Sequence, residues 1–137
     1  IREETSSIMR RLMRLVVEKG TGGRAAADGY LVGGKTGTAE KAVGGRYKRD
    51  ALIASFVSAF PMNDPRYVVF AMLDEPKGNA ETHGFRSAGW TAAPIVGRLI
   101  SRIGPILSIS PVNEESEAVQ KAMFIPIYSR EKKLASF

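Results

Sequence analysis

Two neighbouring segments of the sequence are largely apolar, and this feature restricts the possible fold more than any other. In residues 51–60 both alternating sets are mostly apolar: Leu52, Phe56 and Phe60 in one, Ile53, Val57 and Ala59 in the other. Residues 67–74 repeat the pattern: Val68, Phe70 and Met72 alternate with Val69, Ala71 and Leu73. Successive side chains of a strand point to opposite faces, so both segments predict strands that need cover on both sides. An uncovered apolar face would be a site of association.

The remaining pattern places these strands in an α+β fold. The turn signal Pro61–Arg66 between them predicts an antiparallel hairpin, and residues 30–38 predict a third strand of the sheet. Apolar residues at three- and four-residue spacing predict two amphipathic helices, over about 6–19 and 91–103. Two helices cover roughly one face of a small sheet. We therefore expect both helices on one face, and we infer that the chain is a fragment or a subunit of a larger body.

The ends of the helices are predicted from their flanking residues. Thr5 or Ser6 is expected to cap the first helix, and Gly20 is expected to stop it. Gly104–Pro105 is expected to end the second helix. The polar stretch 40–50, which contains two adjacent glycines, is predicted to be a loop.

A chain of 137 residues corresponds to about one domain. We divide it into residues 1–104, which carry the predicted sheet and helices, and residues 105–137, a C-terminal extension or tail. Within the extension, residues 112–124 could form a short helix. Met9 and Met13 are interpreted as core residues of the first helix.

The composition excludes several classes of site. The chain has no cysteine, which rules out disulfides, thiolate metal sites and a cysteine nucleophile. Its one histidine, His83, has no cluster of potential ligands around it, so no metal is expected and His83 is placed at the surface or the rim of a cleft. Tyr47, Phe85 and Trp90 are interpreted as packing or rim residues. No apolar run approaches the roughly 20 residues that span a membrane.

The net charge of +6 raises the question of a polyanionic partner. The basic residues are scattered, with few aromatic residues among them and no nucleic-acid-binding motif. We interpret them as a solvated basic surface and expect no nucleic-acid partner. The first group of this set lies on the first predicted helix: Arg10, Arg11 and Arg14.

The stretch Gly29–Thr38 matches two motifs with different chemistry. Gly29, Gly34, Lys35 and Thr36 fit the phosphate-binding pattern G-x-x-x-x-G-K-[ST]. The overlapping run KTGT, residues 35–38, fits the third signature of serine enzymes that open β-lactams and acyl-D-alanine peptides. The first pattern requires a strand before Gly29 and a helix that begins near Lys35. Residues 24–28 are a poor strand, and the glycines after Lys35 disfavour a helix.

The second motif requires an extended strand beside a cleft. There Lys35 would offer a positive charge, and Thr36 and Thr38 would offer hydroxyls to a carboxylate. Gly37 leaves no side chain between the strand and the ligand backbone, so an extended peptide could pair along the edge. The predicted strand, the hairpin after it and the terminal helix agree with this reading.

At this point a resemblance to a known family is recognisable. Four stretches resemble the C-terminal part of class B penicillin-binding proteins, above all the division-specific peptidoglycan transpeptidases: GYLVGGKTGTAEK, GGRYKRD, LIASFVSAFPMNDPRYVVFAMLDEP and SAGWTAAPIVGRLI. The likeness covers about residues 5–104. It implies a β-lactamase/transpeptidase-like fold, with helices on one face of an antiparallel sheet and an all-helical region on the other.

The resemblance also implies a mechanism in which a serine attacks the penultimate D-alanine carbonyl of a stem peptide, through a covalent acyl-enzyme. It assigns Lys35 and Thr38 to catalysis and Lys35, Thr36, Gly37 and Thr38 to substrate binding. Lys35 would supply positive potential, and the two threonine hydroxyls would bind the substrate carboxylate. The backbone N–H of Thr38 would be one of two donors to the oxyanion.

Two family motifs, S-x-x-K and S-x-N, belong upstream of KTGT and do not occur there. Ser129 and Lys132 match S-x-x-K on the wrong side of KTGT, and we interpret this match as chance. The chain alone is therefore predicted to be inactive. A β-lactamase or β-lactam-sensing domain shares the KTG strand and is the nearest alternative, and a nucleotide-binding protein is the alternative of another class. A third alternative is a non-catalytic interaction module, such as a degenerate penicillin-binding homologue.

Partners and setting follow from the resemblance alone. The expected partners are the N-terminal part of the same transpeptidase domain, the stem peptide ending in acyl-D-Ala-D-Ala, β-lactams and divisome proteins. The implied setting is the inner membrane with a periplasmic catalytic domain. No cofactor is implied.

Overall fold

The computed structural model describes residues 1–125. Three helices, a short 3₁₀ turn and three strands follow one another along the chain: α1 (Glu3–Lys19), η1 (Gly23–Ala25), β1 (Gly33–Val43), β2 (Arg46–Phe60), β3 (Tyr67–Asp74), α2 (Ala92–Ile106) and α3 (Glu117–Met123). The predicted α+β class is confirmed, and β3 has the predicted bounds. Among these residues no helix combines the length and the apolar character needed to cross a membrane.

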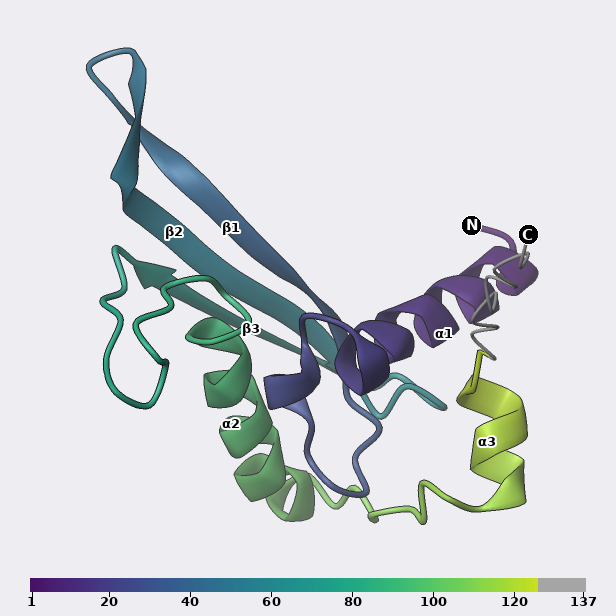
Figure 1. Ribbon diagram of the computed structural model, residues 1–137. Helices are drawn as coiled ribbons and strands as arrows, with labels where there is room; N and C mark the ends of the chain where they lie inside the picture. Colours follow the sequence, from purple (N-terminus) through teal and green to yellow (C-terminus); the bar gives the residue numbers. More distant parts are fainter. Residues whose placement is uncertain (126–137) are drawn as a thin grey trace, which may run out of the picture.

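The three strands form one antiparallel sheet in the order β1-β2-β3. In the register, Lys35 of β1 lies opposite Val57 of β2, and Val57 lies opposite Phe70 of β3. The predicted hairpin between β2 and β3 is therefore present. Because the long β2 is central, β1 and β3 are the two edges of the sheet formed by residues 1–125 (Figure 1).

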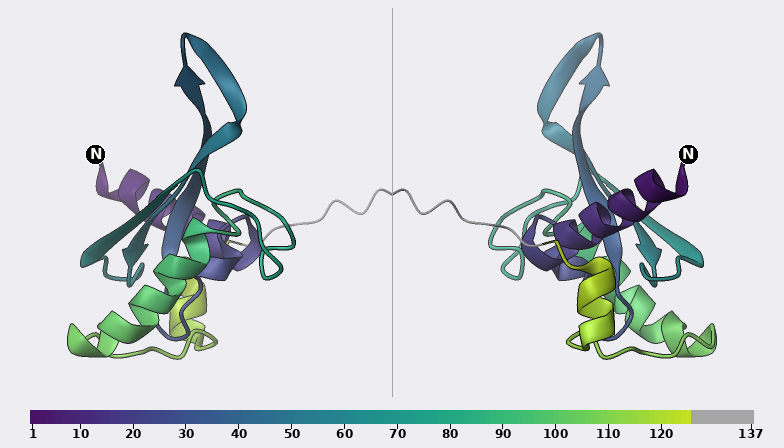
Figure 2. Two further views of the ribbon diagram at one scale, coloured as in Figure 1. Left: turned by 90° about the vertical axis from the view of Figure 1, so that its left-hand side faces the viewer. Right: turned by 90° about the vertical axis from the view of Figure 1, so that its right-hand side faces the viewer.

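One face of the sheet carries the core. Four successive inward positions of β2 are completely or almost completely buried: Ala54, Phe56, Ser58 and Phe60. Helix α2 packs on this face and contributes Ala93, Val96 and Ile100 to the same cluster, which also contains Val17 from the end of α1. Both helices thus contribute to this core, α1 through its C-terminal end. Figure 2 shows α1, α2 and the sheet from two further sides. Gly34 is needed here, because a Cβ at residue 34 would lie 2.3 Å from the carbonyl oxygen of Val57 and 2.9 Å from the ring of Phe56.

The opposite face of the sheet is open. Its large apolar side chains are exposed by 40% at Val57, 72% at Val68, 60% at Phe70 and 58% at Met72. In β3 the exposed residues alternate strictly with half-buried ones that face the core. The strands are thus apolar on both faces, as the sequence indicated, and the described part of the chain covers only one of them.

The predicted loop over residues 40–50 is wrong, because β1 and β2 continue as a projecting hairpin arm (Figure 1). The turn of the arm is Gly44–Gly45, with φ of 59° and 79°, the left-handed values that two-residue hairpin turns require. A register shift between Glu40 and Lys41 separates the arm from the sheet below it. At its base, Lys41 Nζ lies 2.9 Å from Asp74 Oδ1 and 3.1 Å from Glu75 Oε1. These two hydrogen bonds raise the pKa of Lys41 above its usual value.

Three predicted helix ends are corrected or confirmed by the structure. Helix α1 begins at Glu3 after Arg2, which makes no side-chain capping bond, so the predicted cap at Thr5 or Ser6 is wrong; its predicted end at Gly20 is confirmed. Helix α2 runs through Gly104–Pro105 to Ile106, so its predicted end is wrong. The glycine serves packing instead, since a Cβ at residue 104 would lie 2.3 Å from the ring of Tyr30.

Several interpretations of single residues change as well. Met13 packs against the second apolar cluster, around Leu31 and Met62, as expected, but Met9 is about half exposed. Arg14 is not a solvated surface residue, because it is only 5% exposed. The short helix expected within residues 112–124 is confirmed as α3. The division of the chain at residue 104 stays a prediction.

Candidate functional site

The KTGT run, residues 35–38, lies wholly within strand β1. No helical turn begins at Lys35, where the strand continues for eight more residues to Val43. A phosphate-binding loop of the G-x-x-x-x-G-K-[ST] type would turn into a helix at this lysine. The backbone geometry therefore excludes that alternative.

Strand β1 directs the backbone groups of Thr36 and Thr38 outward. The N–H of Glu75 donates to the carbonyl of Leu52 at 2.8 Å, so Leu52 and the alternate residues after it bond toward β3. The intervening residues of β2 must bond toward β1, because backbone groups alternate along a strand. Their partners in β1 include Lys35 and Gly37. Thr36 and Thr38 lie between these partners, so their N–H and C=O groups point to the free edge.

The two threonine side chains tie the strand to its neighbours. Thr36 Oγ1 lies 3.0 Å from Thr21 Oγ1, in the turn after α1. Thr38 Oγ1 accepts a hydrogen bond of 3.1 Å from the backbone N–H of Ala88, in the loop before α2. Lys35 Nζ donates to the carbonyl of Thr36 at 2.8 Å, which brings the ammonium group to the same edge. Gly37 leaves room for Ser55, since a Cβ there would lie 2.7 Å from Ser55 Oγ.

A groove of about 500 Å³ runs along this edge. The side chains and backbone that form its walls come from three segments: Thr21, Arg24, Thr36, Thr38, Ser87 and Trp90. The guanidinium of Arg24 lies 3.7 Å from the centre of the Trp90 ring system. Phe85 stacks on Trp90 at 5.0 Å and His83 meets it edge-on at 5.4 Å. Trp90 thus lines the groove, whereas His83 and Phe85 contact Trp90, and their rim position stays a prediction.

Part of the groove comes from residues that no sequence motif marks. Thr21 and Arg24 come from a turn-rich stretch without periodicity, and Ser87 from a polar loop. No pattern in the sequence marks these residues as neighbours of KTGT. In the described range, residues 1–125, no three histidine, cysteine, aspartate or glutamate side chains gather as metal ligands. The S-x-x-K match at Ser129 lies outside the described residues.

Comparison with known proteins identifies the family of this chain. The model of the penicillin-binding protein transpeptidase domain matches residues 1–99. Among curated proteins, the chain is 46% identical to a probable peptidoglycan D,D-transpeptidase FtsI of Caulobacter vibrioides, over 82% of this chain and 20% of the relative. It is 41% identical to stage V sporulation protein D of Bacillus subtilis, over 85% of this chain and 17% of that relative.

Solved structures agree with the sequence matches. The transpeptidase domain of Burkholderia pseudomallei penicillin-binding protein 3 is 36% identical, with a TM-score of 0.68 over 80% of this chain and 32% of that one. Penicillin-binding protein 3 of Mycobacterium tuberculosis, solved with ampicillin, is 28% identical, with a TM-score of 0.70 over 82% of this chain and 26% of that one. The chain spans about a fifth of the length of the curated relatives it matches. The chain therefore belongs to the penicillin-binding protein transpeptidase family, among its division-specific class B members.

Proposed function

We propose that the intact protein is a peptidoglycan D,D-transpeptidase and that this chain supplies the substrate-binding wall of its active site. The observation that carries the proposal is the outward N–H of Thr38 on a strand that forms one edge of the sheet within residues 1–125, beside a groove. An extended peptide can add to such an edge as a further strand. The ammonium of Lys35 lies at the same edge, where it favours an anionic substrate.

In the proposed reaction, a serine hydroxyl attacks the penultimate D-alanine carbonyl of a stem peptide. The carbonyl oxygen becomes an oxyanion, which accepts a hydrogen bond from the N–H of Thr38. The C–N bond to the last D-alanine breaks, that amino acid leaves with a proton on its amine, and a serine ester remains. An amine of a second stem peptide then displaces the serine and forms the cross-link. Loss of one oxyanion donor costs about 3 kcal/mol in comparable enzymes.

The roles of the other residues follow from the groove. Lys35 supplies positive potential near the nucleophile and the substrate carboxylate. The hydroxyls of Thr36 and Thr38 bind that carboxylate, and Gly37 keeps the strand free of a side chain. The nucleophile is supplied by a part of the protein outside this chain. β-Lactams react at the same place because they carry a carboxylate beside a strained acyl bond.

The partner of this chain is the N-terminal part of the same domain. The open face of the sheet, with Val57, Val68, Phe70 and Met72 exposed, fits a covering layer of apolar helices. The free edge of β3 fits an additional strand. We also propose that the intact protein binds division proteins of the cell envelope. Its location would be the inner membrane, with the catalytic domain in the periplasm.

The proposal is tested on the full-length protein with a fluorescent penicillin. We expect one covalent label per molecule in the wild type, and a rate of labelling reduced roughly a hundredfold in Lys35→Ala, because an electrostatic contact to the reacting centre is lost. Lys121→Ala removes an exposed lysine of α3 and is the matched control. Absence of labelling in the wild type, or equal rates in the two variants, would contradict the proposal.

Turnover separates the proposed function from its nearest alternative. A β-lactamase hydrolyses the acyl-enzyme quickly with an activated water, whereas a transpeptidase keeps the label. A label that persists on the wild type favours the transpeptidase. The isolated 137-residue chain should not be labelled at all, and a stoichiometric adduct at Ser129 would refute this expectation.

A further inference from the structure

We propose that Glu114, in the segment between α2 and α3, is a positioning residue for the KTGT strand. It holds the approach loop, which we define as residues 29–32, immediately before β1 begins at Gly33. The proposal rests on the proposed function for its catalytic readout. The family model matches residues 1–99, so Glu114 lies outside the part of the chain on which the family assignment depends.

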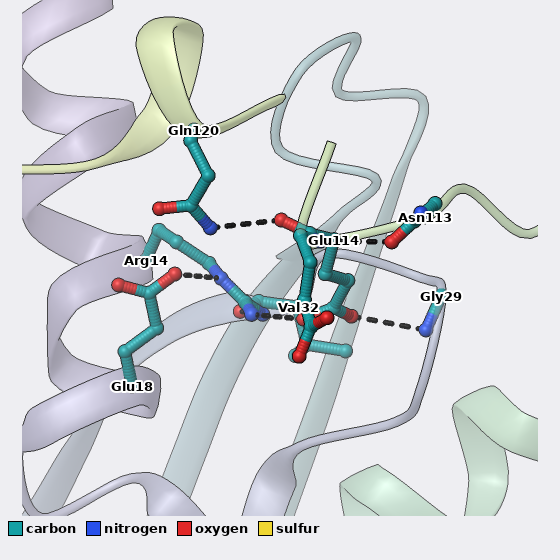
Figure 3. A network of polar contacts seen from close by, with 8 residues as sticks. Arg14, Glu18, Gly29, Val32, Asn113, Glu114 and Gln120 are labelled. Atoms are coloured by element: carbon teal, nitrogen blue, oxygen red, sulfur yellow. Dashed lines mark hydrogen bonds and ion pairs between the residues drawn. The ribbon is translucent and has the colours of Figure 1, made fainter. Parts of the chain in front are cut away.

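Glu114 joins the approach loop to helix α1 with both of its carboxylate oxygens. Oε1 accepts a hydrogen bond of 2.9 Å from the backbone N–H of Gly29. Oε2 accepts one of 2.5 Å from Nη2 of Arg14. Arg14 in turn donates through Nη1 to the carbonyl of Val32 at 3.0 Å (Figure 3). The first and last residues of the loop are therefore held by one connected network.

The guanidinium of Arg14 needs these contacts because it is buried. Arg14 is 5% exposed, and its guanidinium also donates to Glu18 Oε1 at 2.9 Å. A buried cation is costly unless it is paired and its donors are satisfied. One of the two carboxylates that pair with the Arg14 guanidinium belongs to Glu114. Glu114 is 31% exposed and lies 100 positions later in the chain.

The segment around Glu114 is itself fixed. The N–H of Val112 donates to the carbonyl of Gly29 at 2.9 Å, which gives the loop a second bond from the same segment. Gln120 Nε2 of α3 donates to the carbonyl of Glu114 at 2.8 Å (Figure 3). Gly29 has φ of 81°, and a Cβ on it would lie 2.6 Å from Pro111. The segment thus packs closely on the loop and can hold it in place.

The position of the loop determines the position of the active edge. Val32 is followed directly by Gly33, and Lys35 comes two residues later in the same strand. The carbonyl of Leu31 accepts a hydrogen bond of 3.0 Å from the N–H of Met62, so the loop is also tied to the turn after β2. A strand transmits a displacement along its axis. Release of the loop should therefore shift the Thr38 N–H relative to the reacting carbonyl.

Glu114→Gln is the sharpest test, because it keeps the size of the side chain. A carboxylate can accept from both Gly29 and Arg14, whereas an amide has one oxygen and turns an NH₂ group toward a donor. Glu115→Gln removes the same charge from the adjacent, exposed residue and is the matched control. In the full-length protein, the amplitude of labelling by a fluorescent penicillin counts folded sites, and the rate constant reports their geometry.

We expect Glu114→Gln to react roughly ten- to a hundredfold more slowly at unchanged amplitude, because small misplacements of reacting groups have effects of this size. Glu115→Gln should match the wild type. Equal rates in the two variants, or a lower amplitude with the wild-type rate, would overturn the proposal and leave Glu114 a purely structural residue.

A second measurement does not depend on catalysis. Amide hydrogen exchange at Gly29 and at residues 33–38 should be faster in Glu114→Gln than in Glu115→Gln, while exchange in β3 should be unchanged. If the wild type takes no label, the proposed function fails, and this comparison still decides whether Glu114 holds the strand. Unchanged exchange in residues 29–38 would overturn the proposal by itself.

Discussion

The open face of the sheet predicts weak self-association of the 137-residue chain. The exposed fractions of Val57, Val68, Phe70 and Met72 together equal a little over two fully exposed residues. Covering them contributes about 3–7 kcal/mol per copy at 1.5–3 kcal/mol for each buried side chain. When two copies cover each other the gain is roughly 6–14 kcal/mol, which is comparable with the 4–15 kcal/mol cost of association. We therefore expect a reversible, concentration-dependent complex.

Phe70→Ser tests this expectation. Phe70 is 60% exposed, so loss of its ring should weaken the association by about 1–2 kcal/mol for each copy. The association constant of the dimer should therefore fall by more than tenfold. Sedimentation velocity over a concentration series measures the change. Tyr47→Ser is the control, because Tyr47 is 77% exposed but lies on the hairpin arm, away from the open face. A monodisperse wild-type monomer, or an equal effect of Tyr47→Ser, would refute the reasoning.

Three further substitutions test single contacts. Thr38→Val removes the acceptor of the Ala88 N–H, so exchange of that amide should accelerate roughly five- to tenfold, as for the loss of about 1 kcal/mol; unchanged exchange would contradict the contact. Gly34→Ala should lower the free energy of unfolding, measured by urea titration, by about 1–3 kcal/mol, since the new Cβ meets a backbone oxygen at 2.3 Å. Lys41→Met should loosen the hairpin arm, seen as faster amide exchange there. Because the pKa of Lys41 is raised by hydrogen bonds to Asp74 and Glu75, this difference should persist from neutral pH up to 10.5 and disappear as the pH rises further through the raised value.

The sheet and the helices could be predicted because their patterns are local. Alternation in 51–60 and 67–74 and the helical spacing in 6–19 depend only on near neighbours, and the corresponding elements are present. The hairpin arm was missed because its strands project from the body and pack against little. Without a buried face there is no apolar alternation to read, and only the two glycines marked its turn.

The site was predictable in part for the same reason. The KTGT strand and its edge position followed from a motif and the order of elements. The turn that contributes Thr21 and Arg24 could not be assigned to the site from the sequence. It meets the strand only in the folded chain, and no sequence pattern links the two segments. Arg14 shows the limit most clearly. Its charge suggested a surface residue, yet it is buried and paired with a residue 100 positions away, and no local pattern records such a pair.

The hydrogen bonds of strand β1 leave its outward edge with more available donors than acceptors. The outward carbonyl of Thr36 already accepts from Lys35, and the hydroxyl oxygen of Thr38 already accepts from Ala88. The edge therefore offers a ligand mostly donors: an ammonium, a hydroxyl proton and the N–H of Thr38. Groups rich in lone pairs, such as carboxylates and carbonyls, are matched by this arrangement, whereas an ammonium-bearing group would meet like charge and protons. Under the proposed function, such an edge would favour the carboxyl end of a peptide over its amino end before any chemistry begins.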